Sequence, residues 1–137
     1  MVSARDARRS TPLHVAVDMS NEPITRYLIE KEADLNALNE DRGPPLTYSR
    51  KVETARLLIE KGANIDIDIP NDGVLGWLLN LRRKEVAEFL LDVGAELPDI
   101  ESPGALNLLR NAISCGSLKC FDKFIQKGFD PLHESDA

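Results

Sequence analysis

The sequence predicts an all-α protein: a helical repeat solenoid of about four helix-turn-helix units joined by hairpin-like fingers. One helix ending recurs four times, with two apolar residues, a polar pair, a glycine, a small or apolar residue and then an acidic residue or asparagine. The residues at the helix stop are spaced 30, 32 and 34 residues apart: Glu32, Gly62, Gly94 and Gly128. A regular period of this length is typical of stacked helical pairs, each of which buries its apolar side against its neighbours.

Apolar spacing and turn residues between the apolar stretches predict eight helical segments. In chain order they span residues 12–19 and 23–31, 46–50 and 52–61, 74–82 and 84–93, and 107–115 and 117–127. The first segment follows Thr11, whose hydroxyl is a good N-cap, and it opens on Pro12, whose missing N–H costs nothing at that position. Leu13 and Val17 then share one helix face. In the fourth repeat we expect Asn107 to take the capping role of Thr11.

A tetrad at the start of the first helix indicates the type of repeat. Residues 11–14 read Thr-Pro-Leu-His, and Pro44-Pro45-Leu46 follows 33 residues later as a degenerate copy. Together with the four registered helix endings, this tetrad resembles the ankyrin repeat. The resemblance implies one domain over 1–137, with repeats at about 6–38, 39–68, 69–101 and 102–131 and a polar tail at 132–137. It also implies that His14 hydrogen-bonds the backbone of the neighbouring turn.

The pattern is broken in three places. Glu32 replaces glycine at the first helix stop, where a left-handed conformation costs a side chain about 1 kcal/mol, so we expect the first repeat to end differently. The second repeat is short between Leu46 and Val52, and Thr47 stands where the tetrad has histidine. The third repeat has no tetrad. We therefore expect residues 44–52 to be the least regular part of the fold.

Charge and composition exclude several classes of function. The net charge is −6 and the pI about 4.9, so the surface repels phosphates and neither nucleic acid nor an anionic membrane is expected as a partner. No stretch approaches the roughly 20 apolar residues that span a bilayer. The N-terminus lacks the apolar core of a signal peptide. We therefore expect a cytoplasmic monomer.

No residue set indicates a catalytic, cofactor or metal site. The two histidines are His14, which belongs to the tetrad, and His133, which lies in the polar tail. Cys115 and Cys120 are too few for a disulfide framework or a metal-ligand set, so we expect two reduced, mostly buried thiols in helices. The acidic run at 66–73 fails as a calcium loop, because proline and asparagine occupy its fifth and sixth positions.

The resemblance implies a concave binding face formed by the finger tips and the first helices. Carried over by register, the expected contact residues are Arg8, Ser10, Asp18, Met19, Glu40, Asp41, Arg42, Tyr48, Arg50, Asp68, Asn71, Asp72, Trp77, Asn80 and Leu81. Trp77 has two interpretations: a binding hot spot, or a core residue that fills the space left by the short second repeat. Tyr48 and Arg50 are similar cases.

We therefore expect a non-enzymatic protein–protein interaction module that acts as an adaptor, an inhibitor or an immunity-type protein. Its acidic fingers favour a partner with a basic or mixed-charge surface. Two alternatives stay open: a structural repeat segment of a larger multidomain protein, and an enzyme with an unrecognised site. Terminal repeats usually carry a polar outer face, which fits Arg5, Arg8 and Arg9. At the other end we expect Phe124 in the core and Phe129 either exposed or folded back.

Overall fold

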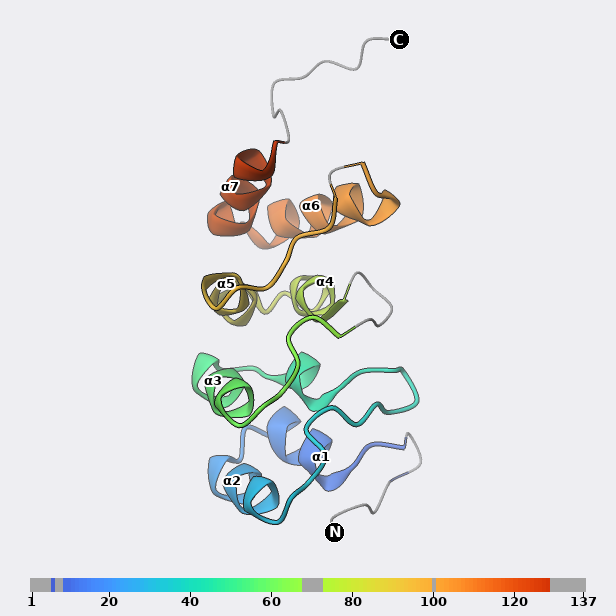
Figure 1. The fold of residues 1–137 in the computed structure, drawn as a ribbon, viewed down its shortest axis with the longest axis vertical. Helices are drawn as coiled ribbons and strands as arrows, with labels where there is room; N and C mark the ends of the chain where they lie inside the picture. Colours follow the sequence, from blue (N-terminus) through green and yellow to red (C-terminus); the bar gives the residue numbers. More distant parts are fainter. Residues whose placement is uncertain (1–5, 7–8, 68–72, 100, 129–137) are drawn as a thin grey trace.

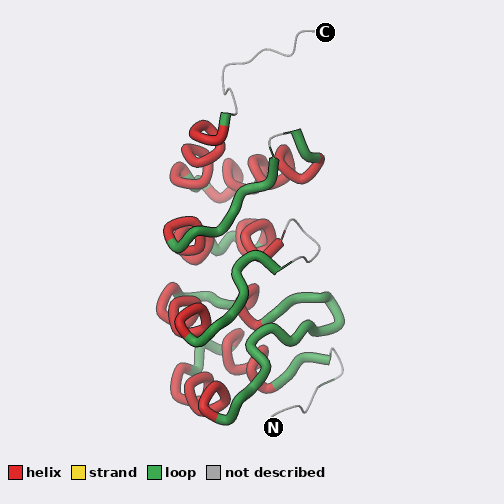
Figure 2. Tube along the Cα trace, in the orientation of Figure 1, coloured by secondary structure: helices red, strands yellow, loops and turns green. Residues whose placement is uncertain are grey.

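The computed structural model describes residues 6, 9–67, 73–99 and 101–128. All regular structure within these residues is helical, and the helices stack in pairs along one axis (Figure 1). The elements are α1 (Pro12–Asp18), α2 (Glu22–Glu30), the 3₁₀ helix η1 (Pro45–Tyr48), α3 (Val52–Glu60), α4 (Gly73–Asn80), α5 (Lys84–Asp92), α6 (Pro103–Cys115) and α7 (Leu118–Lys127). The first helices of the repeats form one column and the second helices form the other, and loops project beside the first column (Figure 2). The predicted helical solenoid is confirmed.

Small and aliphatic side chains fill the space between the helices. Leu13, Leu58, Leu78 and Leu90 are fully buried. Four alanines in the helices are buried, at positions that are 0–5% exposed: Ala16, Ala55, Ala87 and Ala112. A side chain with a single methyl group lets neighbouring backbones approach, which explains how the stack packs with few aromatic residues. Phe124 is fully buried, as expected, whereas Phe129 lies outside the described residues.

The second repeat has the short first helix that the sequence predicts. Its first helix is the four-residue η1, the only 3₁₀ segment among the described residues. The Thr47 hydroxyl donates to the Pro44 carbonyl at 2.7 Å and closes this turn. Thr47 is fully buried, and η1 contacts both α1 and α4. The missing helical turn therefore lies in the middle of the first-helix column, where it must be compensated by packing.

The fourth repeat corrects one sequence prediction. Helix α6 begins at Pro103, not at residue 107, and Asn107 is an exposed residue inside the helix. Ser102 is the N-cap, in extended backbone, and Pro103 follows at the first helical position, which suits its fixed φ. The buried Ala105 and Leu108 extend the apolar pattern one turn upstream. The other predicted segments agree with the structure to within two residues at each end.

The end of the first repeat corrects a second prediction. Glu32 adopts φ 64°, the same left-handed turn that Gly62 makes at φ 111°. The Glu32 N–H donates to the Ile29 carbonyl, and the Ala33 N–H donates to the Leu28 carbonyl. An equivalent pair of bonds closes α3. The first repeat therefore ends like the others, because two hydrogen bonds and the burial of Ala33 hold Glu32 in an unfavourable conformation.

Glu32→Gly is expected to stabilise the chain by about 1 kcal/mol, because glycine adopts the left-handed conformation without the steric cost of a Cβ. Urea unfolding followed by circular dichroism would measure the gain. Glu32→Ala is the matched control, since it removes the exposed carboxylate and keeps the backbone cost. Equal stabilisation by both variants would show that charge, not backbone strain, limits this position.

Candidate functional site

His14 joins α1 to the first finger, the loop at residues 33–44. The backbone N–H of Thr11 donates to His14 Nδ1 at 3.0 Å. Because Nδ1 accepts this bond, Nε2 carries the ring proton and donates to the Gly43 carbonyl, 2.8 Å away. His14 is 2% exposed. The structural role that the resemblance implied for His14 is confirmed by these contacts, and the ring fixes the finger against the helix.

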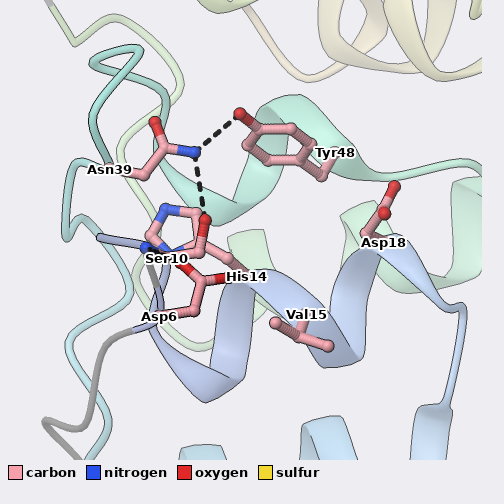
Figure 3. Close-up of a pocket in the computed structure, with 7 residues that line it drawn as sticks. All are labelled: Asp6, Ser10, His14, Val15, Asp18, Asn39 and Tyr48. Carbon is pink, nitrogen blue, oxygen red and sulfur yellow. Dashed lines mark hydrogen bonds between the residues drawn. The ribbon is translucent and has the colours of Figure 1, made fainter. Parts of the chain in front are cut away.

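Asn39 holds the first finger closed from within. Its Oδ1 accepts from the backbone N–H groups of Asp41, at 3.1 Å, and Gly43, at 3.0 Å. Its Nδ2 donates to the Tyr48 hydroxyl at 2.7 Å and to Ser10 Oγ at 3.4 Å, as Figure 3 shows. A single buried amide thus connects the finger turn to the first and second repeats. Asn39 was not predicted as a functional residue; its one local signal is an asparagine four residues before a glycine in a polar turn.

Three aromatic rings run along the stack across the short second repeat. The His14 and Tyr48 ring centroids are 5.9 Å apart, and those of Tyr48 and Trp77 are 6.3 Å apart. Trp77 is 9% exposed, and its six-membered ring lies so close to Gly43 that a Cβ there would come within 2.7 Å of it. The burial of Trp77 favours the packing interpretation over that of a contact residue. We name His14, Tyr48 and Trp77 the aromatic column.

The predicted contact residues fall into two groups. Arg8, Asp68, Asn71 and Asp72 lie outside the described residues. Of the others, Glu40, Asp41 and Arg42 at the tip of the first finger are exposed, Ser10 is half-buried, and Asn80 is exposed at the end of α4. Met19 and Leu81, which follow α1 and α4 at equivalent positions, are 72% and 40% exposed. Apolar side chains that no described part of the chain covers are therefore available to a partner.

Arginines gather near the ends of the first helices. The Arg50 guanidinium donates to the Asp18 carbonyl at 2.9 Å and pairs with its carboxylate at 3.1 Å, so two predicted contact residues bind each other across the first two repeats. Arg83 donates to the Thr47 carbonyl at 3.3 Å. Burial, with the nearby Arg50 charge, lowers the pKa of the Arg83 guanidinium below its ordinary value. The described part of the face thus places Glu40 and Asp41 at the tip of the first finger and arginines near the ends of the first helices.

A cavity of about 130 Å³ lies between α1, the first finger and η1 (Figure 3). Its lining is mostly polar: Asp6, Ser10, His14, Val15, Asp18, Asn39 and Tyr48. The Asp6 carboxylate accepts the Ser10 N–H at 2.8 Å. The His14 and Asn39 atoms described above are committed to the scaffold. The Asp18 carboxylate, which also pairs with Arg50, and the Tyr48 phenol oxygen line the same cavity, and oxygens of this kind suit a group that donates hydrogen bonds and carries positive charge.

The structure gives the two thiols different environments. Cys120 is fully buried on α7, whereas Cys115 is half-buried and its thiol donates to the Leu79 carbonyl at 2.9 Å. Burial, and then the charge of Glu88, raise the pKa of the Cys120 thiol to about 12. Across the described ranges, no three histidine, cysteine or carboxylate side chains gather closely enough to hold a metal ion. In the same ranges no helix has the length and apolarity needed to cross a bilayer.

The folded chain is expected to react slowly with a thiol reagent at Cys115 and not at all at Cys120, because a thiol with a raised pKa forms no thiolate near neutral pH. Cys115→Ser isolates the buried thiol. Labelling with Ellman's reagent should then require unfolding by urea. Rapid labelling of folded Cys115→Ser would contradict this prediction.

Stacked helical pairs, projecting fingers and a histidine-anchored turn define an α-helical repeat solenoid with an exposed face. The chain belongs to the ankyrin repeat family, since the family model described as "Ankyrin repeats (3 copies)" matches residues 2–71. An ankyrin repeat domain from Acinetobacter baumannii AYE shares the fold, with a TM-score of 0.74 and 23% identity over 93% of this chain and 69% of that one.

Curated relatives are longer proteins. The transient receptor potential channel pyrexia of Drosophila melanogaster is 30% identical over 66% of this chain and 10% of its own length. Subfamily A member 1 of the same channel class and organism is 29% identical over 80% of this chain and 9% of its own length. An ankyrin repeat-containing protein of Schizosaccharomyces pombe is 26% identical over 72% and 42%. The chain thus spans about a tenth of the two channel proteins.

Proposed function

We propose that the chain is a non-enzymatic protein-interaction module of the cytoplasm that binds a partner protein through its concave face and finger tips. The ankyrin repeat fold is generally a protein-binding fold. The observation that supports this role here is an exposed set of side chains beside a first finger that the hydrogen bonds of His14 and Asn39 hold in place. Because His14, Asn39 and Trp77 fix the finger, little conformational entropy is lost when a partner binds.

The proposed partner has a basic or mixed-charge surface. The tip of the first finger carries Glu40 and Asp41 beside Arg42, and the carboxylate of Asp18 lines the neighbouring cavity. A lysine or arginine of the partner could donate charge-assisted hydrogen bonds to the oxygens that line this cavity. Arg50 competes for Asp18, since the two already form an exposed pair. The net gain from a partner cation is therefore modest, and apolar contacts with Met19 and Leu81 supply the rest.

An affinity pull-down with matched variants tests this proposal. Leu81→Glu places a charge on the proposed binding face. Val93→Glu is the control: it places the same charge at the end of α5, and Val93 is 41% exposed where Leu81 is 40% exposed. The native chain and Val93→Glu should retain the same partners in mass spectrometry, and Leu81→Glu should lose them with an unchanged melting temperature. Retention weakens at high salt if acidic fingers contribute. If only Val93→Glu lost the partners, the binding surface would lie on the side of the second helices and the proposal would be wrong.

A second candidate is a repeat segment of a larger protein, which the length of the curated relatives favours. An immunoblot of the native source with an antibody raised against this chain would measure the mass of the protein that contains it. A band near 15.2 kDa, the mass of the chain, supports an independent module. A much heavier band supports the segment.

A further inference from the structure

The first repeat exposes a position that every later repeat buries. Aligned by their helix stops, the equivalent residues of the second helices are Ile24, Thr54, Val86 and Cys120. Ile24 is 50% exposed, while the other three are 0–6% exposed. Each later repeat packs on the repeat before it, whereas no described helical pair packs on this side of the first repeat, so the position is on the side that faces a preceding repeat. Tyr27 shows the same difference: it is 57% exposed, whereas the equivalent residue of the second repeat, Leu57, is 4% exposed. The polar outer face expected of the first repeat therefore includes two large apolar side chains.

The fourth repeat exposes the positions that face the following repeat. In the first helices, Val17 and Leu79 are 0% and 1% exposed, but the equivalent Ile113 is 61% exposed. In the second helices, Thr25, Ala55 and Ala87 are buried, but the equivalent Phe121 is only half-buried. Because the inner repeats bury these positions under a neighbour, Ile113 and Phe121 belong to a stacking face that no described repeat covers.

This face forms an apolar groove between α6 and α7. Ala112, Ile113, Gly116, Ser117, Leu118 and Phe121 line a shallow cavity of about 230 Å³. Leu118 is 77% exposed. Leu106, 60% exposed, lies seven residues before Ile113 and thus on the same side of α6. Of the nine exposed large hydrophobic side chains among the described residues, five lie at the two ends: Ile24, Tyr27, Leu106, Ile113 and Leu118.

We propose that the two ends bind each other in separate copies of this chain, so that the Ile113 groove of one copy receives the α2 face of the next. The two faces are the halves of an interface that already occurs three times within the chain, between consecutive repeats. A second copy supplies the matching half in the correct register. Such a head-to-tail contact is heterologous, so association continues beyond a dimer as concentration rises. The expected monomer then holds only at low concentration.

Complementary variants test this arrangement by sedimentation velocity over a wide concentration range. Ile24→Glu disables only the α2 face and Ile113→Glu disables only the groove, and both side chains are exposed enough for the fold to persist. The mean mass of the native chain should rise above 15.2 kDa with concentration, and each variant alone should stay monomeric. Their equimolar mixture should form a species of two copies and stop there, because one groove and one α2 face remain intact. Val93→Glu, at an inner repeat, should associate like the native chain.

Several outcomes would overturn the proposal. A native chain that stays monomeric at every concentration leaves the groove to another occupant, such as a further repeat. Normal association of Ile24→Glu alone would indicate that two grooves meet face to face. A mixture that remains monomeric would show that the two faces are not partners. Leu81→Glu, which removes the proposed partner binding, should associate normally, so the two proposals can fail separately.

Discussion

Trp77→Ala is expected to lower the free energy of unfolding by about 3–5 kcal/mol, the usual cost of deleting a buried large aromatic side chain. The ring of Trp77 belongs to the third repeat, but it packs on Tyr48 and against Gly43 of the second. Its loss would leave a cavity beside η1, the element with the fewest residues to repack. Urea unfolding monitored by circular dichroism would measure the change, since the variant contains no tryptophan.

The same variant is expected to uncouple the two halves of the stack. Repeat arrays draw their stability from interfaces between neighbours, so weakening one interface allows each side to unfold at its own midpoint. The native chain should unfold in one transition and Trp77→Ala in two. Trp77→Phe is the control, because it keeps an aromatic ring in the column, and it should lose less stability and retain one transition. A single, unshifted transition for Trp77→Ala would mean that the aromatic column contributes nothing to coupling.

Local signals in the sequence predicted most of the fold. The helix stops at Gly62, Gly94 and Gly128 take the left-handed conformation, and Thr11 caps α1 together with His14. Both features depend on a few adjacent residues, so the sequence contains them directly. The start of α6 was missed because Asn107 and Ser102 are both acceptable caps, and only the burial of Ala105 and Leu108 selects the earlier one. Glu32 was misjudged because tertiary packing overrides a backbone preference of about 1 kcal/mol.

The candidate site was less predictable, because its geometry depends on contacts between repeats. Register alone indicated which residues face outward, and Met19 and Leu81 are exposed as that register requires. It did not reveal that Asp18 and Arg50 pair with each other, or that Arg83 reaches Thr47 from a residue 36 positions away. Asn39 was not singled out, since its partners Ser10 and Tyr48 come from different repeats. A side chain that links three segments leaves no periodic trace in the sequence.

Asn39→Ala is expected to lower the free energy of unfolding by about 2 kcal/mol, because it leaves buried hydrogen-bonding groups without partners. Asn39 is 6% exposed, and the Gly43 N–H that it satisfies is buried with it. Gly43 also presents its carbonyl to His14, so loss of the amide loosens the finger at its junction with α1. Chemical unfolding measures the loss. Faster hydrogen exchange at Asp41 and Gly43 would locate it in the first finger.

Tyr48→Phe separates the bond to Tyr48 from the other bonds of the amide. It removes the hydroxyl that accepts from Asn39 Nδ2 at 2.7 Å, keeps the ring in the aromatic column and leaves the Asn39 oxygen to accept from the finger backbone. If the Asn39–Tyr48 bond couples the finger to η1, the losses from Asn39→Ala and Tyr48→Phe should not add in the double variant. Additive losses would contradict this coupling. If, in addition, the finger amides of Asn39→Ala stayed protected from hydrogen exchange, the finger would not depend on Asn39, and the aromatic column alone would stabilise this junction.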